Sequence, residues 1–475
     1  MKVCVLQPDY STSNVDYKNY DPPRDLSSLL PDHHVDHVFI NKLTTYKQLK
    51  QLSTQGYDIF VNLCESYLEW EVPSIDVIYS LDLLNLPYTG PTVDLYDPPK
   101  ELMKYVAYIS GIEVPNYRIV KNLEDLNDLS TQLKFPLFVK PSKAGDSLGV
   151  DDKSFVQDEK NLLLKVRNLL NEFGEVLVEE YIEGREFTVL VAADSKDEKK
   201  CIAFKPVEYL FPEGFSFKTY KLKTSELHPE SNVPCKEENL DRKLRRAACG
   251  IFKEFGGKGY ARMDFRMNTK GKIYFLEINF TCSVFYSQGY EGSADHILLC
   301  DGIGQAGFLN QIIQEGIQRH RRKQKKYIVK KNAIAGYGIY ALNKIRKGEI
   351  IFKGEERSQR IVTKAFVDKN WNAADKEVFR KYAYPIGNDV YILWDNKPEE
   401  WAPQNHSCSP NTIYHGLNVI ACKDIEKFEE LTLDYASFLD EQMEAFVCTC
   451  GSPNCRAWIS NGKTEEKVKN IKAFI

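Results

Sequence analysis

The sequence predicts an α/β or α+β region followed by a mostly β region that ends in clustered cysteines. Short apolar, strand-like runs alternate with helical patterns from Cys4 to Thr281, which is typical of domains that mix helices with sheets. After Lys331 the runs are short and β-type, and Gly, Pro and Asn separate them. The 475 residues correspond to about three domains at roughly 100 to 200 residues each. We therefore expect more than one functional site.

Composition and charge exclude several classes of protein. Hydrophobic residues make up 43% and charged residues 27%, values that exclude disordered, collagen-like and coiled-coil chains. A net charge of -4 argues against a polycationic nucleic-acid binder. Neither a signal-peptide pattern nor a run of about 18 apolar residues occurs, so we expect an intracellular protein, cytoplasmic or nuclear, with no membrane partner.

A basic run marks the main predicted boundary. One interpretation is a solvated helix end and linker; the other is a patch for an acidic partner or for nuclear import. Direct nucleic-acid binding is expected only at this patch, 319–331. Its basic residues are Arg319, Arg321, Arg322, Lys323, Lys325, Lys326, Lys330 and Lys331.

Cysteines near the C-terminus predict a zinc site. In a reducing compartment, clustered thiols among the 12 cysteines are better explained as metal ligands than as disulfides. The C-x-C-x4-C pattern supplies Cys448, Cys450 and Cys455, whereas structural zinc takes four ligands. Cys408, in a turn-like Asn-His-Ser-Cys-Ser-Pro-Asn segment, is the leading candidate for the fourth, and Cys422 is the second.

Four further motifs surround these cysteines in a fixed order. A G-x-G at Gly336–Gly338 lets a main chain approach a ligand closely, although alone it is typical of a tight turn. It precedes N-H-S-C-S-P-N from Asn405, E-L-T-L-D-Y from Glu430, the cysteines and Trp458. The block from about Lys326 to Asn461 resembles a SET-domain methyltransferase with a post-SET zinc motif.

That resemblance implies a knotted, mostly β fold that binds S-adenosylmethionine on one face and admits a lysine side chain from the other. Tyr435 would be the catalytic tyrosine, and Tyr382, Tyr384 and Tyr391 are candidates for the lysine channel. Ala402–Gln404 and Leu433 depart from the family pattern, and Leu433 leaves the number of methyl groups open. The implied methyl-donor site consists of Gly336, Tyr337, Gly338, Asn405, His406 and Trp458.

The N-terminal two thirds combine a phosphate-type loop with converging oxygen ligands. Lys140 ends a buried strand and precedes the Gly-rich segment 145–150, which suits triphosphate binding. Asp264 and the pair Glu277 and Asn279 lie on strands joined by a turn, so a hairpin can bring them together. Oxygen ligands beside a triphosphate are what magnesium requires.

Residues 1 to about 315 resemble the ATP-grasp superfamily, most closely D-alanyl-D-alanine ligases. The matching stretches include LNLPYTG, FVKP, GDSLGV, VEEYIEGREFTV, RMDF and EIN. The resemblance implies three lobes and activation of a carboxylate as an acyl phosphate that an amine then attacks. Arg262 would stabilise the oxyanion, Lys221 would reach the transferred phosphate, and Asp264, Glu277 and Asn279 would hold two magnesium ions. The implied ATP contacts are Lys100, Lys140, Glu179, Tyr181, Ile182 and Glu186.

The two resemblances together predict seven segments: ATP-grasp lobes at 1–99, 100–185 and 186–315, a basic linker at 316–327, a SET domain at 328–440, a post-SET motif at 441–462 and a tail at 463–475. After Asn279 the chain continues Phe280-Thr281-Cys282-Ser283, without the family's Pro-Gly acceptor turn, and QPDYSTSNVDY lacks its acidic amine-binding pattern. The ATP-binding half thus keeps the family's pattern, whereas the substrate half does not indicate D-alanine.

Three hypotheses follow for the whole chain. The favoured one is a bifunctional ligase and N-methyltransferase that acts on an amino acid or peptide. The second is a protein (histone) lysine methyltransferase whose ATP-grasp portion recruits substrate or senses nucleotide. The third is a non-enzymatic chromatin-binding protein, against which the retained Tyr435 and the complete cysteine set argue.

Overall fold

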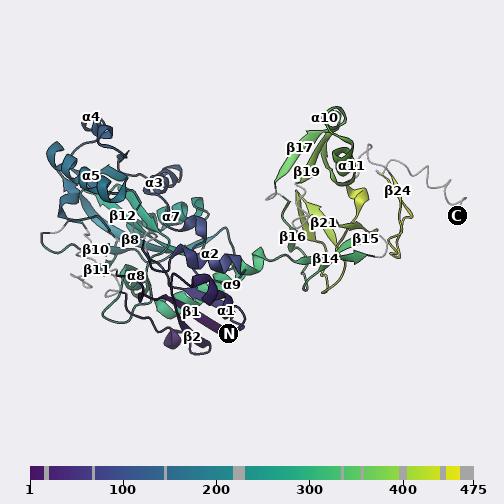
Figure 1. Ribbon diagram of the computed structural model, residues 1–475, viewed down its shortest axis with the longest axis horizontal. Coiled ribbons are helices and arrows are strands. Elements are labelled where there is room, and N and C mark those ends of the chain that lie inside the picture. The colour runs from purple at the N-terminus through teal and green to yellow at the C-terminus, as the bar shows by residue number, and fades with distance from the viewer. Residues whose placement is uncertain are drawn as a thin grey trace, which may run out of the picture. The chain divides into compact units, whose positions relative to one another are not determined.

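The chain divides into two compact units, Met1–Lys323 and Gln324–Ile475 (Figure 1). The computed structural model describes residues 1–14, 21–66, 70–143, 147–214, 216–217, 231–332, 336–354, 358–394, 404–438 and 445–460. Within these residues no helix has both the length and the apolar composition needed to cross a membrane.

The first unit begins with a three-stranded parallel sheet in the order β2-β1-β3. Its central strand, β1, is buried throughout residues 3–8, as expected for a parallel strand that is covered on both faces. The elements of this lobe are β1 (Lys2–Pro8), β2 (His34–Ile40), α1 (Thr45–Leu52), β3 (Ile59–Asn62) and α2 (Ile75–Leu83).

The second lobe is a four-stranded antiparallel sheet in the order β4-β7-β5-β6, covered by helix α5. Its core packs Val139 and Val178 of the sheet against Leu162, Val166 and Leu169 of the helix. The predicted strand that ends at Lys140 is confirmed as β5. The elements are β4 (Tyr117–Val120), α4 (Leu129–Gln132), β5 (Leu137–Pro141), β6 (Phe155–Val156), α5 (Glu159–Phe173) and β7 (Val176–Glu180).

The third lobe is a six-stranded antiparallel sheet in the order β11-β10-β8-β12-β13, with β9 paired to β8. Helices α3 and α7 share one hydrophobic core with this sheet, so α3 packs on the third lobe although the sequence assigned it to the second. The predicted hairpin is confirmed as β12 and β13. The elements are α3 (Lys100–Ile109), β8 (Gly184–Ala193), β9 (Cys201–Ala203), β10 (Val207–Tyr209), β11 (Asn232–Pro234), α7 (Glu238–Glu254), β12 (Tyr260–Asn268) and β13 (Ile273–Asn279).

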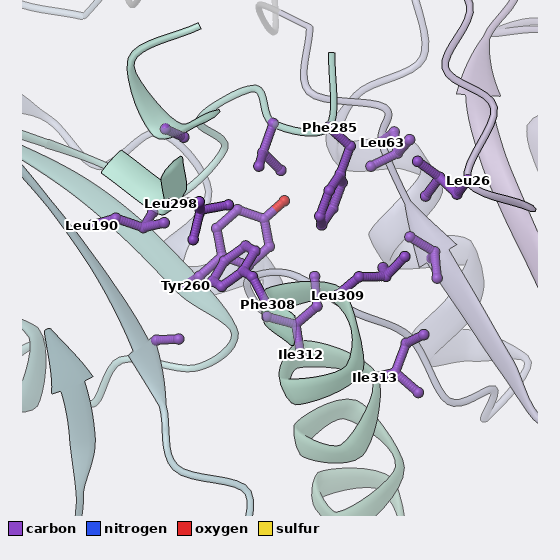
Figure 2. Packing of buried hydrophobic residues seen from close by; sticks show 14 of the residues in the cluster. Leu26, Leu63, Leu190, Tyr260, Phe285, Leu298, Phe308, Leu309, Ile312 and Ile313 are labelled. Atoms are coloured by element: carbon purple, nitrogen blue, oxygen red, sulfur yellow. The ribbon is translucent and has the colours of Figure 1, made fainter. Parts of the chain in front are cut away.

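Helices α8 (Ser293–Asp301) and α9 (Gly304–Lys323) join the first and third lobes. Figure 2 shows Phe308 and Leu309 of α9 among side chains from both lobes, including Leu63 and Tyr260. This shared core holds the two lobes together as parts of one unit.

The basic linker predicted over 316–327 is wrong in its first part, because α9 continues to Lys323. Arg319 is 7% exposed and donates to the carbonyl oxygens of Tyr88 (2.7 Å) and Gly90 (2.8 Å). Lys323 pairs with Asp82 at 3.4 Å. Part of the basic run therefore anchors α9 within the first unit instead of forming a free patch.

The second unit consists mostly of short strands, as predicted for its SET-like part. Its small core includes Ile339, Ile351, Ala421 and Leu431. The elements are β14 (Tyr327–Asn332), β15 (Gly336–Ala341), β16 (Ile350–Phe352), β17 (Gln359–Thr363), α10 (Lys364–Asn370), α11 (Ala373–Tyr382), β18 (Tyr384–Gly387), β19 (Val390–Trp394), β20 (Asn405–His406), β21 (Thr412–His415), β22 (Asn418–Ala421), β23 (Thr432–Leu433), β24 (Phe446–Val447) and β25 (Trp458–Ile459).

One pairing in this unit positions its motifs. Strands β20 and β23 are parallel, with Asn405 opposite Thr432 and His406 opposite Leu433. Two segments that are distant in the sequence are thereby adjacent, so Asn405 and His406 lie beside the turn that carries Tyr435.

Close packing of α9 against the first lobe gives a stability prediction. A Cβ added at Gly316 would collide with the carbonyl oxygen of Tyr88, whereas a Cβ at Gly250 in α7 meets nothing within 4 Å. Gly316→Ala should lower the free energy of unfolding by about 1–3 kcal/mol. Gly250→Ala should raise it by up to about 1 kcal/mol, since alanine favours a helix. Thermal unfolding followed by circular dichroism measures both; equal stability of the two variants would contradict the packing.

Candidate active sites

The first unit contains a pocket between its four-stranded and six-stranded sheets. It has a volume of about 760 Å³, open solvent at its mouth included. Phe138, Leu148 and Phe217 give it an apolar part, and charged side chains make up much of the rest. The pocket brings together these residues that the sequence predicted for nucleotide or metal binding: Lys100, Lys140, Glu179, Tyr181, Ile182, Glu186, Asp264 and Glu277.

Two buried lysines share one carboxylate at the wall of this pocket. Glu179 is 3% exposed; one of its oxygens lies 2.8 Å from the Lys140 ammonium and the other 2.5 Å from that of Lys104. The resemblance implied Glu179 as an ATP contact, and Lys104 was not included in the site. The only available signal was the position of Lys104, one helical turn after Lys100. In the structure the Glu179 carboxylate holds the two lysines.

Burial and charge act in opposite directions on these groups. Desolvation lowers the pKa of Lys104 below its usual range, although the Glu179 carboxylate opposes the shift. Desolvation acts on Lys140 as well, but the carboxylates of Glu179 and Glu277 outweigh it and raise the pKa. Lys140 is thus held as a cation that faces the pocket.

Carboxylates on the opposite wall form the predicted metal face. Asp264 of β12 lies directly across from Glu277 of β13, and Arg262 lies across from Asn279. The Lys100 ammonium is 3.8 Å from a Glu277 oxygen. Magnesium takes oxygen ligands such as these carboxylates on adjacent strands. The neighbouring lysines suit the phosphates that would share the ion. These residues therefore fit the ion.

Several predicted positions are outside the described residues. They are Lys221 and, in the Gly-rich segment, Gly145 and Asp146. Their predicted roles stay predictions.

A buried polar cluster that sequence reasoning missed lies where the first lobe meets the chain after β13. The Arg24 guanidinium pairs with Asp21 at 3.4 Å and Glu65 at 3.3 Å, and it donates to the carbonyl oxygen of Val284 at 3.0 Å. The Tyr286 hydroxyl donates to Asp21 at 2.8 Å. Burial raises the pKa of Glu65 to about 8. This cluster ties the segment that replaces the expected acceptor turn to the first lobe.

In the second unit, Glu430 connects the G-x-G strand to Asn405. The Asn405 amide donates to a Glu430 oxygen at 2.8 Å and to the carbonyl oxygen of Tyr337 at 2.9 Å. A Cβ at Gly338 would collide with that Glu430 oxygen. The missing Cβ at Gly338 leaves room for this Glu430 oxygen, a contact that the sequence did not predict. The G-x-G and Asn405 do lie together, as predicted.

Tyr435 is held at both its backbone and its hydroxyl. Its backbone N–H donates to Nδ1 of His406 at 3.1 Å, and its hydroxyl donates to the carbonyl oxygen of Gln404 at 2.5 Å. Burial raises the pKa of Tyr435 to about 12. The hydroxyl consequently stays protonated at neutral pH and can act as a hydrogen-bond donor.

Aromatic rings extend from Tyr435 across the unit. Phe438 lies 5.5 Å from the Tyr435 ring, and Tyr384 and Tyr414 lie 4.5 Å apart, each within 5.6 Å of Phe438. Of the three tyrosines proposed for the channel, Tyr384 belongs to this group. Tyr391 is 2% exposed and packs in a separate core.

The four predicted zinc ligands lie together. The sulfur atoms of Cys408, Cys448, Cys450 and Cys455 are all within 4.8 Å of one another. Cys422 instead donates to the carbonyl oxygen of Pro410 at 3.5 Å, so the choice of Cys408 over Cys422 agrees with the geometry. Four converging thiols fit a tetrahedral zinc ion.

The cysteine cluster contacts the tyrosine turn at two points. Nε2 of His406 lies 3.3 Å from the sulfur of Cys408, and the Arg456 guanidinium pairs with Asp434. Trp458 pairs with Val447 in the β24–β25 ladder beside the cluster, and its place in the methyl-donor site stays a prediction. Metal binding at the cysteines would therefore hold the segment around Tyr435 in place.

Comparisons with protein families agree with both halves of this arrangement. Residues 107–285 match the family model described as D-ala D-ala ligase C-terminus, and residues 336–436 match the SET domain model. The chain thus joins an ATP-grasp region like that of D-alanine ligases to a SET domain. The cysteines at 448–455 lie beyond the matched SET range.

Individual relatives are similar to the first unit. A D-alanine--D-alanine ligase of Aquifex aeolicus is 32% identical over 202 residues, which cover 42% of this chain and 64% of that protein. One from Legionella pneumophila is 27% identical over 261 residues, covering 51% and 68%. This chain therefore spans less than two thirds of the length of the Aquifex relative.

Solved structures show the same fold. The D-alanine--D-alanine ligase of Bacillus anthracis complexed with ATP aligns with a TM-score of 0.51 at 20% identity, covering 68% of this chain and all of that one. The ligase of Coxiella burnetii aligns with a TM-score of 0.50 at 18% identity, covering 68% and 97%. At these identities the likeness concerns the fold alone.

The cysteine geometry predicts one zinc ion per chain. Cys450→Ser should lose it, because three thiolates no longer complete the tetrahedron, while Cys422→Ser should keep it. Elemental analysis of the purified full chain gives the metal content of each variant. Zinc retained in Cys450→Ser, or lost in Cys422→Ser, would contradict the ligand set.

Proposed function

We propose that the chain is a bifunctional enzyme: an ATP-dependent carboxylate–amine ligase fused to an S-adenosylmethionine-dependent N-methyltransferase that acts on a lysine-like amine. The observation that supports the ligase best is the pocket in which Lys100 and Lys140 face Asp264 and Glu277. Cations and metal-binding carboxylates around one nucleotide-sized space suit phosphoryl transfer.

The ligase reaction needs positioning and charge neutralisation more than a protein nucleophile. A carboxylate oxygen of the substrate attacks the γ-phosphorus and ADP leaves; an amine then attacks the acyl carbon, loses a proton and expels phosphate. Lys140, kept cationic by Glu179, would hold the phosphates. Arg262 lies opposite Asn279 at the end of the metal face, where it would stabilise the oxyanion. Magnesium, when bound, would neutralise further phosphate charge.

The substrate side of the ligase supports a molecule other than D-alanine. The segment after Asn279 lacks the expected acceptor turn, and Val284 and Tyr286 in it engage Arg24 and Asp21 of the first lobe. Because the Arg24 guanidinium already meets two carboxylates and two carbonyl oxygens, it has little capacity left for a substrate carboxylate.

The methyltransferase reaction transfers a methyl group from a sulfonium to a neutral amine by in-line displacement. Alignment of the amine supplies most of the acceleration. The Tyr435 hydroxyl, protonated and buried beside Phe438, would orient the amine, and the surrounding rings favour its neutral form by desolvation. The amine proton must leave to solvent before transfer. Glu430 and Asn405 would hold the G-x-G strand against the methyl donor.

A second candidate function is protein lysine methylation, with the first unit recruiting substrate or sensing nucleotide. The closed Arg24 cluster favours it, because the cluster includes Val284 and Tyr286, which follow the position where the resemblance implies an acceptor turn. The pocket charges favour the first candidate, since nucleotide sensing does not require the metal face.

Removal of the Lys140 charge tests the ligase. Purified chain should form ADP from ATP and magnesium only when a mixture of amino acids is added. Lys140→Met should slow this about a hundredfold or more, because the phosphate charge is no longer neutralised. Lys272→Met, at an exposed lysine paired with Glu113, should leave the rate unchanged. A rate of ADP formation that does not depend on added amino acids, or that is equal in both variants, would count against the ligase.

Labelled S-adenosylmethionine tests the methyltransferase in a cell extract. Tyr435→Phe should reduce label transfer about a hundredfold, because the amine is no longer oriented. Tyr391→Phe, in the separate core, should retain it. Label found only in small molecules supports the bifunctional enzyme, label in proteins supports the second candidate, and no transfer by the unchanged chain would refute both.

A further inference from the structure

Arg266 is a charged residue on the pocket wall that no predicted role uses. It is 4% exposed and follows Asp264 by two positions on β12, so both side chains lie on the same face of the strand. In the antiparallel ladder it lies directly opposite Glu186 of β8, and its guanidinium is 3.8 Å from a Glu186 oxygen. Direct cross-strand partners of opposite charge interact.

The guanidinium also joins several segments around the pocket. It donates to the carbonyl oxygen of Gly184 at 2.9 Å, at the start of β8, and to that of Ser216 at 3.0 Å. It lies over the Tyr181 ring at 4.6 Å, and the Tyr181 hydroxyl donates to the same Ser216 oxygen at 2.8 Å. Its Nε is buried and has no hydrogen-bond partner among the described residues.

The register shows where this group lies within the pocket. Along β12, Asp264 marks the metal face, and Arg266 is displaced from it toward the rings of Tyr181 and Phe211. Glu186 lies opposite Arg266, two residues along β8 from Thr188, which lies opposite Asp264. Glu186 is therefore displaced from the metal face in the same direction, toward the aromatic part of the pocket. In a bound nucleotide the sugar connects the phosphates to the base, and a buried carboxylate at that position accepts hydrogen bonds from hydroxyl groups.

We propose that Arg266 is a positioning residue that holds Glu186 in the orientation that accepts a ribose hydroxyl, so that the pocket selects ribonucleotides over deoxyribonucleotides. The inference rests on the proposed ATP binding. Without this cation the Glu186 carboxylate loses its cross-strand partner, and the loss would fall on the sugar contact more than on the phosphate contacts of Lys140. Arg266 would act on the sugar through Glu186.

Binding without turnover tests this, using ATP, 2′-deoxyATP and 3′-deoxyATP with magnesium by calorimetry on the full chain. In Arg266→Met, ATP should bind about tenfold more weakly, as expected for loss of a hydrogen bond to a charged group. For the deoxynucleotide that lacks the accepted hydroxyl, the binding affinity should change less than about threefold. Arg185→Met removes the neighbouring arginine, which pairs with Glu208 and Glu237, and should leave the discrimination unchanged.

The outcomes separate this inference from the proposed function. Equal weakening of all three nucleotides, or no change, would overturn the positioning role while ATP binding stands. No nucleotide binding by the unchanged chain would overturn both. If Arg266→Met does not fold, Arg266→Lys replaces it, and the loss of affinity for ATP is again compared with that for the deoxynucleotides. Lysine keeps the charge but cannot make both carbonyl contacts and the Glu186 pairing together.

Discussion

The first unit depends on the pairing of buried charges. Three lysines, Lys100, Lys104 and Lys140, are each at most 7% exposed, and an uncompensated charge at such a depth is costly. Glu179 meets two of them and Glu277 the third. Removal of one of these side chains would leave its partner buried without a counter-charge. The lysines and carboxylates on both walls therefore depend on one another. The same arrangement holds Lys140 as a cation at the wall of the pocket.

The second unit depends on a different constraint, the parallel pairing of β20 with β23. This short ladder places His406 where it accepts the backbone N–H of Tyr435, and it places Asn405 beside Glu430. The cysteine cluster adds a second connection through Cys408, which adjoins His406. The cysteine cluster, the G-x-G strand and the tyrosine are thus linked through contacts that join segments distant in the sequence.

Sequence reasoning predicted the elements whose signal is local. The strand ending at Lys140, the β12–β13 hairpin with Asp264 beside Glu277, and the proximity of Cys408 to the other three cysteines followed from spacing, alternation and a turn-like segment. Contacts between segments distant in sequence were missed: Arg24 with Val284, Lys104 with Glu179, and Arg266 with Glu186. Each depends on tertiary packing or on strand register, which local patterns do not specify. The extent of α9 was misjudged because its basic end reads as solvated, although Arg319 bonds to buried carbonyl groups.

The central claim is that the first unit activates a carboxylate by transferring phosphate to it. Amino acids labelled with ¹⁸O in their carboxyl groups, incubated with the chain and ATP in unlabelled water, test this directly by mass spectrometry of the released phosphate. An acyl phosphate intermediate predicts phosphate that carries one labelled oxygen from the acid, since the amine displaces phosphate at the acyl carbon. Phosphate that contains only unlabelled oxygen would contradict the account.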